Sequence, residues 1–371
     1  MTLDSKVMLD PSVYMGSGRV RAEHRFDEAS LERWMRANVE GFEGPLAVEQ
    51  FAGGQSNPTF KLITPTRRYV LRRKPPGALL KGAHAVDREA RVISALYTPG
   101  FPVPRMYGLC TDESVIGTWF YVMDCIDGRI FWESTFPTVF AHERRVYFDA
   151  MNATIAKLHG IDSNEVGLSD FGKPGNYFSR QINRWGSQYL ADTAAGRNPD
   201  MDALLEWLPA NIPPGDETSI VHGDFRVDNM IFHSTEPKVI AVLDWELSTL
   251  GHPLADFTYH LMMYRVPVGI QAGSIGGIDM PSLGLPSESE YLAAYCRRTG
   301  RSGIDNLDFY MAYNLFRLAA ICHGIKGRVI RGTALSVHAA QLTEKFPVLA
   351  ALARRQAARA DSSIGACRNS S

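Results

Sequence analysis

The segment Val221–Asn229 reads VHGDFRVDN, and Asp244 follows fifteen residues after Asn229 within the sequence LDWE. Between them, residues 230–243 contain an apolar run, a polar turn and a second apolar run. This pattern predicts a loop, a short strand, a turn and a second strand that ends on an acid. The carboxylates of Asp224 and Asp244 and the amide of Asn229 then lie on one side of a hairpin, where their oxygens suit Mg²⁺ bound to a nucleotide.

The composition sets the broad class of the protein. The chain has 371 residues, enough for a large core and two lobes. Its 39 basic and 40 acidic residues give a net charge of −1, so nothing favours binding to nucleic acid or to an anionic membrane surface. No apolar run approaches the ~20 residues that span a bilayer, and the first residues lack the apolar core of a signal peptide.

Cysteine usage indicates the redox compartment. The five cysteines are scattered and form no C-x-x-C pair, so the sequence supports neither a disulfide framework nor a zinc site. We therefore expect a reduced, cytoplasmic protein.

The N-terminal third of the chain predicts a small β-rich lobe over residues 26–126, after a loose arm at 1–25. Asp27 is a good N-cap for a helix that ends near Val39. A second helix is predicted at 84–97. Strands are predicted at 46–51, 59–63, 68–72 and 119–123.

A loop and two charged residues of this lobe are candidates for ligand binding. The loop between the first two strands contains Gly53, Gly54 and Ser56. Glycines let a backbone approach a phosphate closely, but a Gly-Gly pair also suits a plain hairpin turn, and no G-K-[ST] sequence follows. Arg72 is the first charge after the third apolar run, and by itself it is interpreted as a solvated strand end. Glu89 borders the apolar stripe of the second helix.

The remainder of the chain, residues 127–359, predicts a mainly helical lobe. A turn at Asp124–Gly128 separates it from the β-rich part, and the polar tail at 360–371 is expected to be disordered. Helices are predicted at 141–159, 176–207, 257–264, 287–299, 306–327 and 333–357.

The order of these features resembles that of the protein-kinase-like phosphotransferases, and more narrowly of the aminoglycoside phosphotransferase and choline kinase superfamily. The phrases YVLRRKPPG at 69–77, HGDFRVDNMIF at 222–232 and VLDWELSTLGHPLADF at 242–257 are most similar to bacterial phosphotransferases from acyl-CoA-dehydrogenase gene neighbourhoods. They also resemble the kinase-like domain fused to some eukaryotic acyl-CoA dehydrogenases. The resemblance covers about residues 27–357. It implies an α+β, two-lobed protein-kinase-like fold with a small β-rich N-lobe and a large, mainly helical C-lobe.

The resemblance implies roles for the residues of the VHGDFRVDN segment and for the acid beyond it. Asp224 matches the catalytic base that takes the proton of the acceptor, and Arg226 falls where a basic residue contacts the transferring phosphate. Asn229 and Asp244 match the two metal ligands. His222 is expected to brace the loop rather than to react.

On the nucleotide side, the resemblance implies that Arg72 holds the α- and β-phosphates and that Glu89 is its helix partner. Arginine stands where protein kinases carry lysine. Its charge still allows phosphate binding, but the geometry of its contacts need not be the same as that of lysine. The further nucleotide-binding residues that the resemblance implies are Gly53, Gly54 and Ser56 in a phosphate-covering loop, and Asp124 and Ile126 in the hinge that pairs with adenine.

Five polar or aromatic residues outside these roles have a structural interpretation beside a functional one. Asp256 is interpreted as a buried acid that ties the backbone of the catalytic loop. Trp245 and Glu246 either line the acceptor pocket or have a structural role, in core packing or in capping a helix. For Arg317 and His323, contact with the substrate is the less favoured interpretation.

We expect an ATP- and Mg²⁺-dependent phosphotransferase, a small-molecule kinase, whose acceptor is a hydroxyl group. Resemblance to the acyl-CoA-dehydrogenase-associated branch suggests a hydroxyacyl-CoA or hydroxy acid acceptor and a functional link to an acyl-CoA dehydrogenase, with no nucleic-acid or membrane partner. Aminoglycosides and choline-type amino alcohols are the alternative acceptors. A polycationic aminoglycoside favours an acidic acceptor lobe, and residues 258–330 contain no acidic run. A catalytically silent, kinase-like binding module is the alternative from another class.

Overall fold

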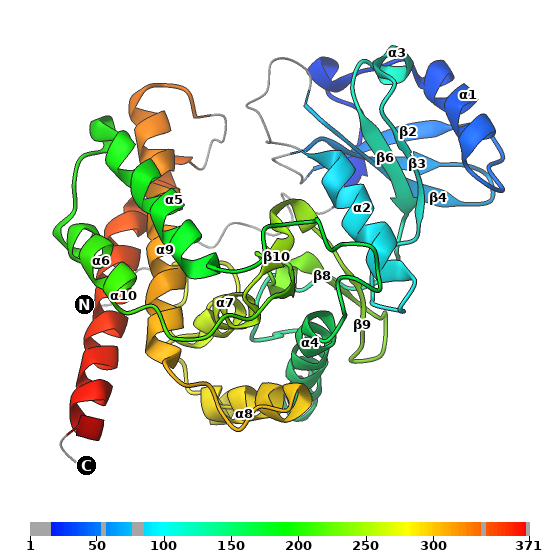
Figure 1. The fold of residues 1–371 in the computed structure, drawn as a ribbon. Helices are drawn as coiled ribbons and strands as arrows, with labels where there is room; N and C mark the ends of the chain where they lie inside the picture. The colour runs from blue at the N-terminus through cyan, green and yellow to red at the C-terminus, as the bar shows by residue number, and fades with distance from the viewer. Residues whose placement is uncertain (1–15, 53–56, 76–84, 335–338, 369–371) are drawn as a thin grey trace. The chain divides into compact units, whose positions relative to one another are not determined.

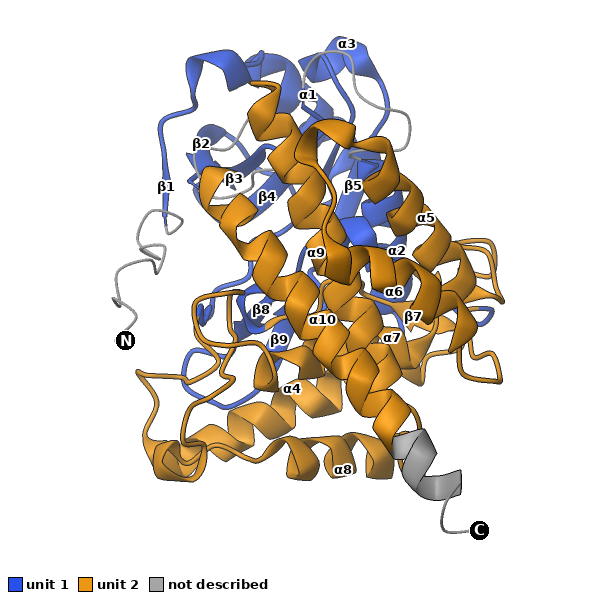
Figure 2. Ribbon diagram, turned by 90° about the vertical axis from the view of Figure 1, so that its left-hand side faces the viewer, with its two compact units in different colours: residues 1–132, 164–168, 227–248 blue, residues 133–163, 169–226, 249–371 orange. Residues whose placement is uncertain are grey.

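The computed structural model describes residues 16–52, 57–75, 85–334 and 339–368 (Figure 1). By its internal contacts the chain forms two compact units (Figure 2). Unit 1 contains residues 1–132, 164–168 and 227–248, and unit 2 contains residues 133–163, 169–226 and 249–371. The lobe boundaries at residues 126 and 359 remain predictions.

Unit 1 contains a six-stranded antiparallel sheet with the strand order β1-β2-β3-β4-β6-β5. Burial alternates along β3, where Phe60 and Leu62 are buried and their neighbours are partly exposed. The strands are β1 (Ser17–Gly18), β2 (Ala47–Phe51), β3 (Thr59–Ile63), β4 (Arg68–Arg73), β5 (Met106–Cys110) and β6 (Phe120–Asp124). A separate hairpin consists of β8 (Met230–Phe232) and β9 (Val239–Val242).

The main apolar cluster of unit 1 joins this sheet to α1 (Glu28–Asn38). Leu31 and Met35 of α1 belong to the same buried cluster as Leu71 of β4. Side chains alternate along a strand, so the side chain of Arg72 leaves the opposite face, where α2 (Val86–Tyr97) supplies its partner. The remaining short helices of unit 1 are η2 (Ala22–His24), α3 (Glu113–Ile116), η5 (Val227–Asn229) and η6 (Trp245–Leu247).

Unit 2 is mainly helical. Its helices are α4 (Arg144–His159), α5 (Tyr177–Ala191), α6 (Pro199–Ala210), α7 (Pro253–Leu261), α8 (Glu288–Thr299), α9 (Leu307–Ile330) and α10 (Ala339–Arg368). Short 3-10 turns are η3 (Ala141–Glu143), η4 (Thr193–Ala195), η7 (Met262–Tyr264) and η8 (Pro281–Leu283). A two-stranded antiparallel pair, β7 (Ser219–Val221) and β10 (Thr249–Gly251), flanks residues 222–248 in the sequence. The predicted α+β fold, with a β-rich part and a larger helical part, is confirmed.

The structure corrects the prediction of one helix over residues 176–207. The segment folds as two helices, α5 and α6, with a break at 192–198. Gly196 has a φ of 77°, which favours glycine, and the Asn198 side chain accepts hydrogen bonds from the amides of Asp200 and Met201. Pro199 then occupies the first turn of α6, so the local sequence starts a new helix rather than continuing the old one.

Both chain ends also differ from the prediction. Helix α10 continues to Arg368, so residues 360–368 are helical rather than part of a disordered tail. The alanine-rich segment 349–360 contains neither proline nor glycine, so no residue there ends the helix. In the N-terminal arm, Ser17–Gly18 pairs with β2, and residues 1–15 lie outside the described part.

Helix length bears on the membrane prediction. Among the described residues, no helix is both long enough and apolar enough to cross a membrane. Even α10, which has 30 residues, carries charged side chains along its length.

Replacing Asp27 by alanine is expected to lower the free energy of unfolding by about 1 kcal/mol, because the amides of Ala29 and Ser30 lose their acceptor at the start of α1. Urea unfolding followed by circular dichroism measures this loss. Asp27→Asn keeps a capping oxygen and should retain most of the stability. Equal stability of the alanine variant and the wild type would contradict the capping role.

Candidate active site

The first part of the candidate site, in unit 1, is centred on Arg72 of β4. The Arg72 Nε lies 3.0 Å from Glu89 Oε2, and its Nη2 lies 2.8 Å from Asp244 Oδ1 and 3.5 Å from Glu246 Oε2. The Arg72 side chain is 13% exposed and that of Glu89 is 1% exposed, whereas that of Asp244 is 35% exposed. One buried guanidinium thus joins a strand, a helix and the end of a hairpin.

Electrostatics keeps the guanidinium of Arg72 charged. Burial by itself lowers the pKa of Arg72, but the surrounding phenol of Tyr121 and the carboxylates of Glu89, Asp244 and Glu246 raise it further than burial lowers it. Burial raises the pKa of Glu89 above its ordinary value, and the charge of Arg72 opposes only part of that rise. Arginine stays protonated under any ordinary condition, so Arg72 provides a permanent cation for phosphate oxygens.

Glu89 is held by more than its ion pair. The Asn57 side-chain amide donates to Glu89 Oε1 at 2.8 Å, and the Tyr121 hydroxyl donates to Oε2 at 3.0 Å. Each carboxylate oxygen therefore has a partner besides Arg72, as a buried charge requires. The predicted pairing of Arg72 with Glu89 is present in the structure.

The β8–β9 hairpin places the two predicted metal ligands at one end. Leu243 donates its amide hydrogen to the carbonyl of Asn229 at 2.8 Å, directly before Asp244 in the chain. Asp244 has a φ of 65°, an uncommon conformation for a residue other than glycine. Strain of this kind is a sign of a functional constraint.

The oxygens of this end fit a magnesium ion that is shared with a nucleotide. Asn229 offers an amide oxygen and Asp244 a partly exposed carboxylate, both of them hard donors of the kind Mg²⁺ prefers. Within the described ranges, no group of three or more His, Cys, Asp or Glu side chains could enclose a metal ion. A magnesium ion held here would therefore take further oxygens from phosphate and water.

The second part of the candidate site, in unit 2, is the loop that carries Asp224. The Tyr259 hydroxyl of α7 donates a hydrogen bond to Asp224 Oδ1, and Arg226 Nε lies 3.4 Å from the same oxygen. Burial by itself raises the pKa of Asp224, but the charge of Arg226 and the hydroxyl of Tyr259 lower it below the ordinary value. Asp224 is therefore ionised at neutral pH and able to accept a proton.

The backbone of this loop is fixed by a buried carboxylate. Asp256 accepts hydrogen bonds from the amides of His222 and Gly223 at 2.7 and 2.8 Å, and His159 Nε2 lies 3.3 Å from the same carboxylate. The Asp224 amide donates to His222 Nδ1 at 3.1 Å. The structural interpretations of Asp256 and His222 agree with these contacts.

Three residues that the sequence did not assign to the loop also hold it. Arg317 of α9 donates to the carbonyl of Gly223 at 2.9 Å, and His260 Nδ1 lies 3.1 Å from the carbonyl of Phe225. Tyr259 is the third. A sequence signal for two of them existed, because Tyr259 and His260 follow Asp256 by three and four residues and thus share its side of a helix.

The remaining predicted residues fare differently. Gly53, Gly54 and Ser56 lie outside the described residues. The Asp124 amide donates to the carbonyl of Arg105 at 2.9 Å, and the contact of Asp124 and Ile126 with adenine remains a prediction. Two further residues contact backbone: Trp245 is buried and donates from Nε1 to the carbonyl of Val242, and His323 Nε2 lies 2.8 Å from the carbonyl of Gly196. Glu246 instead faces the side chain of Arg72.

Comparison with known proteins identifies the family. The model of the phosphotransferase enzyme family matches residues 47–310. The chain belongs to this family. The family predicted from the HGDFRVDN and LDWE segments is thereby confirmed, as is the class of enzyme, a phosphotransferase of the small-molecule kinase type.

Individual relatives extend the comparison. The chain is 45% identical to acyl-CoA dehydrogenase family member 11 of Gallus gallus over 332 residues, which cover 87% of the chain but 42% of that relative. It is 49% identical, with a TM-score of 0.83, to a Ralstonia eutropha JMP134 protein provisionally designated an aminoglycoside phosphotransferase, covering 90% of this chain and 99% of that one.

A more distant structure shares the fold alone. The aminoglycoside phosphotransferase APH(4)-Ia, solved as a thermostable mutant in a ternary complex with AMP-PNP and hygromycin B, is 13% identical with a TM-score of 0.56. The match covers 90% of this chain and 99% of that one. The chain spans less than half the length of the curated acyl-CoA dehydrogenase relative, so the activity of that whole protein does not transfer directly.

Replacing Asp256 by alanine is expected to lower the free energy of unfolding by about 3 kcal/mol, because two buried amides lose their acceptor. Urea unfolding of the purified protein measures the change. The matched control is Asp305→Ala at an exposed position, which should change stability by no more than about 0.5 kcal/mol. A loss for Asp256→Ala as small as that of the control would show that other contacts hold the loop.

Acid is expected to destabilise the fold through His260. Burial lowers the pKa of His260 to about 4, so the unfolded chain binds a proton below about pH 6.5 that the folded chain does not. Its contribution is complete above pH 6.5 and is lost as the pH falls toward 4, by up to about 3 kcal/mol. Denaturation between pH 7 and 4.5 should therefore show a shallower pH dependence for His260→Gln than for wild type. The exposed control His142→Gln should keep the wild-type slope, and equal slopes for all three proteins would refute the assignment.

Proposed function

We propose that the chain transfers the γ-phosphoryl group of ATP, with Mg²⁺, to the hydroxyl of a small anionic acceptor, best a hydroxyacyl-CoA or hydroxy acid. The observation that carries the proposal is the pairing of Arg72 with Glu89 and Asp244. It gathers a phosphate-binding cation and a metal-binding carboxylate at one point, which phosphoryl transfer requires.

On the donor side, Arg72 would bind phosphate oxygens of ATP, while Asn229 and Asp244 would hold the magnesium ion. Bound Mg²⁺ neutralises the charge that develops on the phosphate oxygens. Asp244 has to serve both Arg72 and the metal, and its exposed fraction of 35% leaves room for that. The use of ATP is supported by the family and by the AMP-PNP complex of a protein with the same fold.

On the acceptor side, Asp224 would take the proton of the attacking hydroxyl. The new bond joins that oxygen to the γ-phosphorus, the bond from phosphorus to the β–γ bridging oxygen breaks, and its electron pair leaves with ADP. Tyr259 orients the carboxylate of Asp224 through its hydroxyl. Arg226, 3.4 Å from Asp224, would stabilise the equatorial oxygens of the transferring group.

The charges around Asp224 favour an anionic acceptor. Burial raises the pKa of Asp224, but positive charge from Arg226 and Arg317 helps to lower it below its ordinary value, and Arg226 Nε lies 3.4 Å from Asp224 Oδ1. Two cations of unit 2 thus act on one carboxylate. A polycationic aminoglycoside would be repelled by such a set.

A choline-type acceptor is also disfavoured. Recognition of a quaternary ammonium group calls for open aromatic faces beside the base. The Arg317 guanidinium already lies over the ring of Tyr259 at 5.3 Å and over that of Trp185 at 6.0 Å. These two faces are therefore occupied by a cation of the protein itself.

A link to acyl-CoA oxidation follows from the acceptor. Phosphorylation turns a hydroxyl into a leaving group, which would prepare a hydroxyacyl-CoA for elimination and then for a dehydrogenase. The name of the Gallus gallus relative supports such a link.

The four described cysteines, Cys110, Cys125, Cys296 and Cys322, are free, which supports a reducing, cytoplasmic location.

The proposal is tested by ADP formation with ATP and Mg²⁺ across hydroxyacyl-CoAs, hydroxy acids, amino alcohols and aminoglycosides. We expect a hydroxyacyl-CoA or a hydroxy acid to raise ADP formation most. With that acceptor, Asp224→Asn should lower kcat by about 10²- to 10⁴-fold, because the general base is lost. The control Asp305→Asn, at an exposed site, should leave kcat unchanged.

Two results would overturn the proposal in different ways. Unchanged turnover by Asp224→Asn would remove the base assignment while leaving the reaction intact. ADP formation at background level with every acceptor would favour the silent binding module instead.

A further inference from the structure

A buried arginine lies beside the loop that carries Asp224. Arg317 of α9 is 8% exposed, and its Nη2 donates to the carbonyl of Gly223 at 2.9 Å. Among the described residues, it forms no ion pair with a carboxylate. The acids outside those residues are Asp4 and Asp10 alone. Because buried charges in proteins are normally paired, this guanidinium calls for a negative or strongly polar ligand.

Two aromatic rings lie against this guanidinium. Its Cζ lies 5.3 Å from the ring centre of Tyr259 on α7 and 6.0 Å from that of Trp185 on α5. Both helices pack against α9 (Figure 1). A ring face attracts a cation without neutralising it, and the hydrogen bonds of Arg317 to described residues use Nη2 alone. The other N–H groups of its fork therefore remain available to a ligand.

The indole of Trp185 adds a second donor. Its Nε1 is buried and has no hydrogen-bond partner within the part of the chain that the structure describes. By contrast, the indole N–H of Trp207 donates to Asp361 at 2.8 Å. Nearly all buried N–H groups in folded proteins have an acceptor, so the indole of Trp185 lacks one that a bound ligand would supply.

These groups lie close to the proposed base. Gly223, whose carbonyl accepts from Arg317, directly precedes Asp224, and consecutive Cα atoms are about 3.8 Å apart. The ring of Tyr259 lies against Arg317, and its hydroxyl donates to Asp224 Oδ1. One small acceptor can therefore reach both places, with its hydroxyl at Asp224 and a second polar group at Arg317 and Trp185.

We propose that Arg317 and the indole N–H of Trp185 bind the acyl oxygen of the acceptor. The inference rests on the proposed function, since it takes the acceptor hydroxyl to react at Asp224. An acyl oxygen is the polar atom that hydroxy acids and hydroxyacyl-CoA thioesters share, as a carboxylate in the first and as a carbonyl in the second. A guanidinium donates to either. The two residues would thus select an acyl acceptor over a plain alcohol and hold its hydroxyl toward the base.

Trp185→Phe tests the N–H group while it keeps an aromatic ring beside Arg317. With hydroxybutanoate and with hydroxybutanoyl-CoA, it should lower kcat/KM by about 3- to 10-fold, the effect of one neutral hydrogen bond. With butanediol, which carries hydroxyls but no acyl oxygen, kcat/KM should stay within about twofold of wild type. A loss for only one of the two acyl compounds would support the site and assign it to a carboxylate or to a thioester carbonyl.

Arg317→Lys tests the guanidinium. Lysine keeps a positive charge and a donor for the carbonyl of Gly223, but it lacks the planar fork that would also hold the acyl oxygen. We expect kcat/KM for the two acyl compounds to fall by about 10- to 100-fold, the effect of a charged hydrogen bond, and KM for ATP to stay within about twofold. Equal losses for butanediol and for the acyl compounds would show that Arg317 only braces the loop, and would overturn the site.

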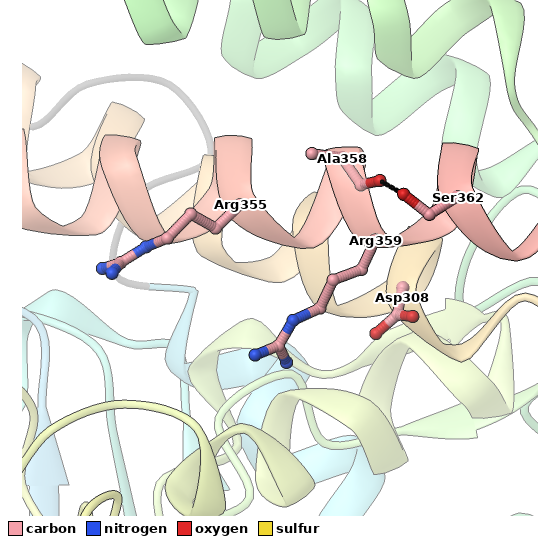
Figure 3. Close-up of a pocket in the computed structure, with 5 residues that line it drawn as sticks. All are labelled: Asp308, Arg355, Ala358, Arg359 and Ser362. Carbon is pink, nitrogen blue, oxygen red and sulfur yellow. Dashed lines mark hydrogen bonds between the residues drawn. The ribbon is translucent and has the colours of Figure 1, made fainter.

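Two matched controls make the same chemical changes elsewhere in unit 2. Trp207→Phe removes the indole N–H that donates to Asp361. Arg355→Lys changes an exposed arginine of α10, which lines a hollow of about 560 Å³ to which neither Arg317 nor Trp185 contributes (Figure 3). Both controls should keep the wild-type kcat/KM with every acceptor, and thermal unfolding of all four variants checks that the fold is intact.

Binding without turnover separates the site from the reaction. Calorimetry with butanoate and butanoyl-CoA, which carry an acyl oxygen but no hydroxyl, should show at least about 3-fold weaker binding by Trp185→Phe than by wild type or Trp207→Phe. Equal binding by the three proteins, or no binding by wild type, would overturn the site. Binding that depends on Trp185, without phosphorylation of any hydroxyacyl compound, would support the site and overturn the proposed function.

Discussion

The guanidinium of Arg72 is the contact on which the candidate donor site depends. Its Nε faces Glu89 and its Nη2 faces Asp244, so β4, α2 and the end of the β8–β9 hairpin meet on one side chain. A charge with 13% exposure is stable only when its partners are in place, because an unpaired buried ion costs several kcal/mol. The same requirement keeps the carboxylate of Asp244 close to a cation that suits phosphate.

In unit 2 the loop that carries Asp224 depends on a buried carboxylate. Asp256 of α7 accepts hydrogen bonds from the amides of His222 and Gly223, and Arg317 of α9 donates to the carbonyl of Gly223. These contacts hold the loop through its backbone. The side chain of Asp224 can therefore accept the hydrogen bond from Tyr259 and take part in the proposed reaction. Preorganised groups of this kind lower the reorganisation that a reaction would otherwise need.

Local sequence patterns predicted those elements whose structure is set by residues close in the sequence. The Asp27 cap, the hairpin after Asn229 and the strand before Arg72 follow from capping, turn and alternation rules that need no distant contact. The prediction of a single helix over 176–207 was wrong. Asn198 caps a new helix and Pro199 occupies its first turn, and this local signal outweighs the helical spacing of the apolar residues on either side.

The sequence by itself determined the family, and it predicted the chemical types in the candidate site: a base, two metal-binding oxygens, a phosphate-binding cation and the acid that pairs with it. Only the tertiary structure decided which of them touch, because Arg72 and Asp244 are 172 residues apart in the chain. It also decided that Arg317 braces the loop and that Arg355 and Arg359 border a hollow. The direction that a helical side chain faces depends on how its helix packs, and sequence spacing defines only which residues share a face.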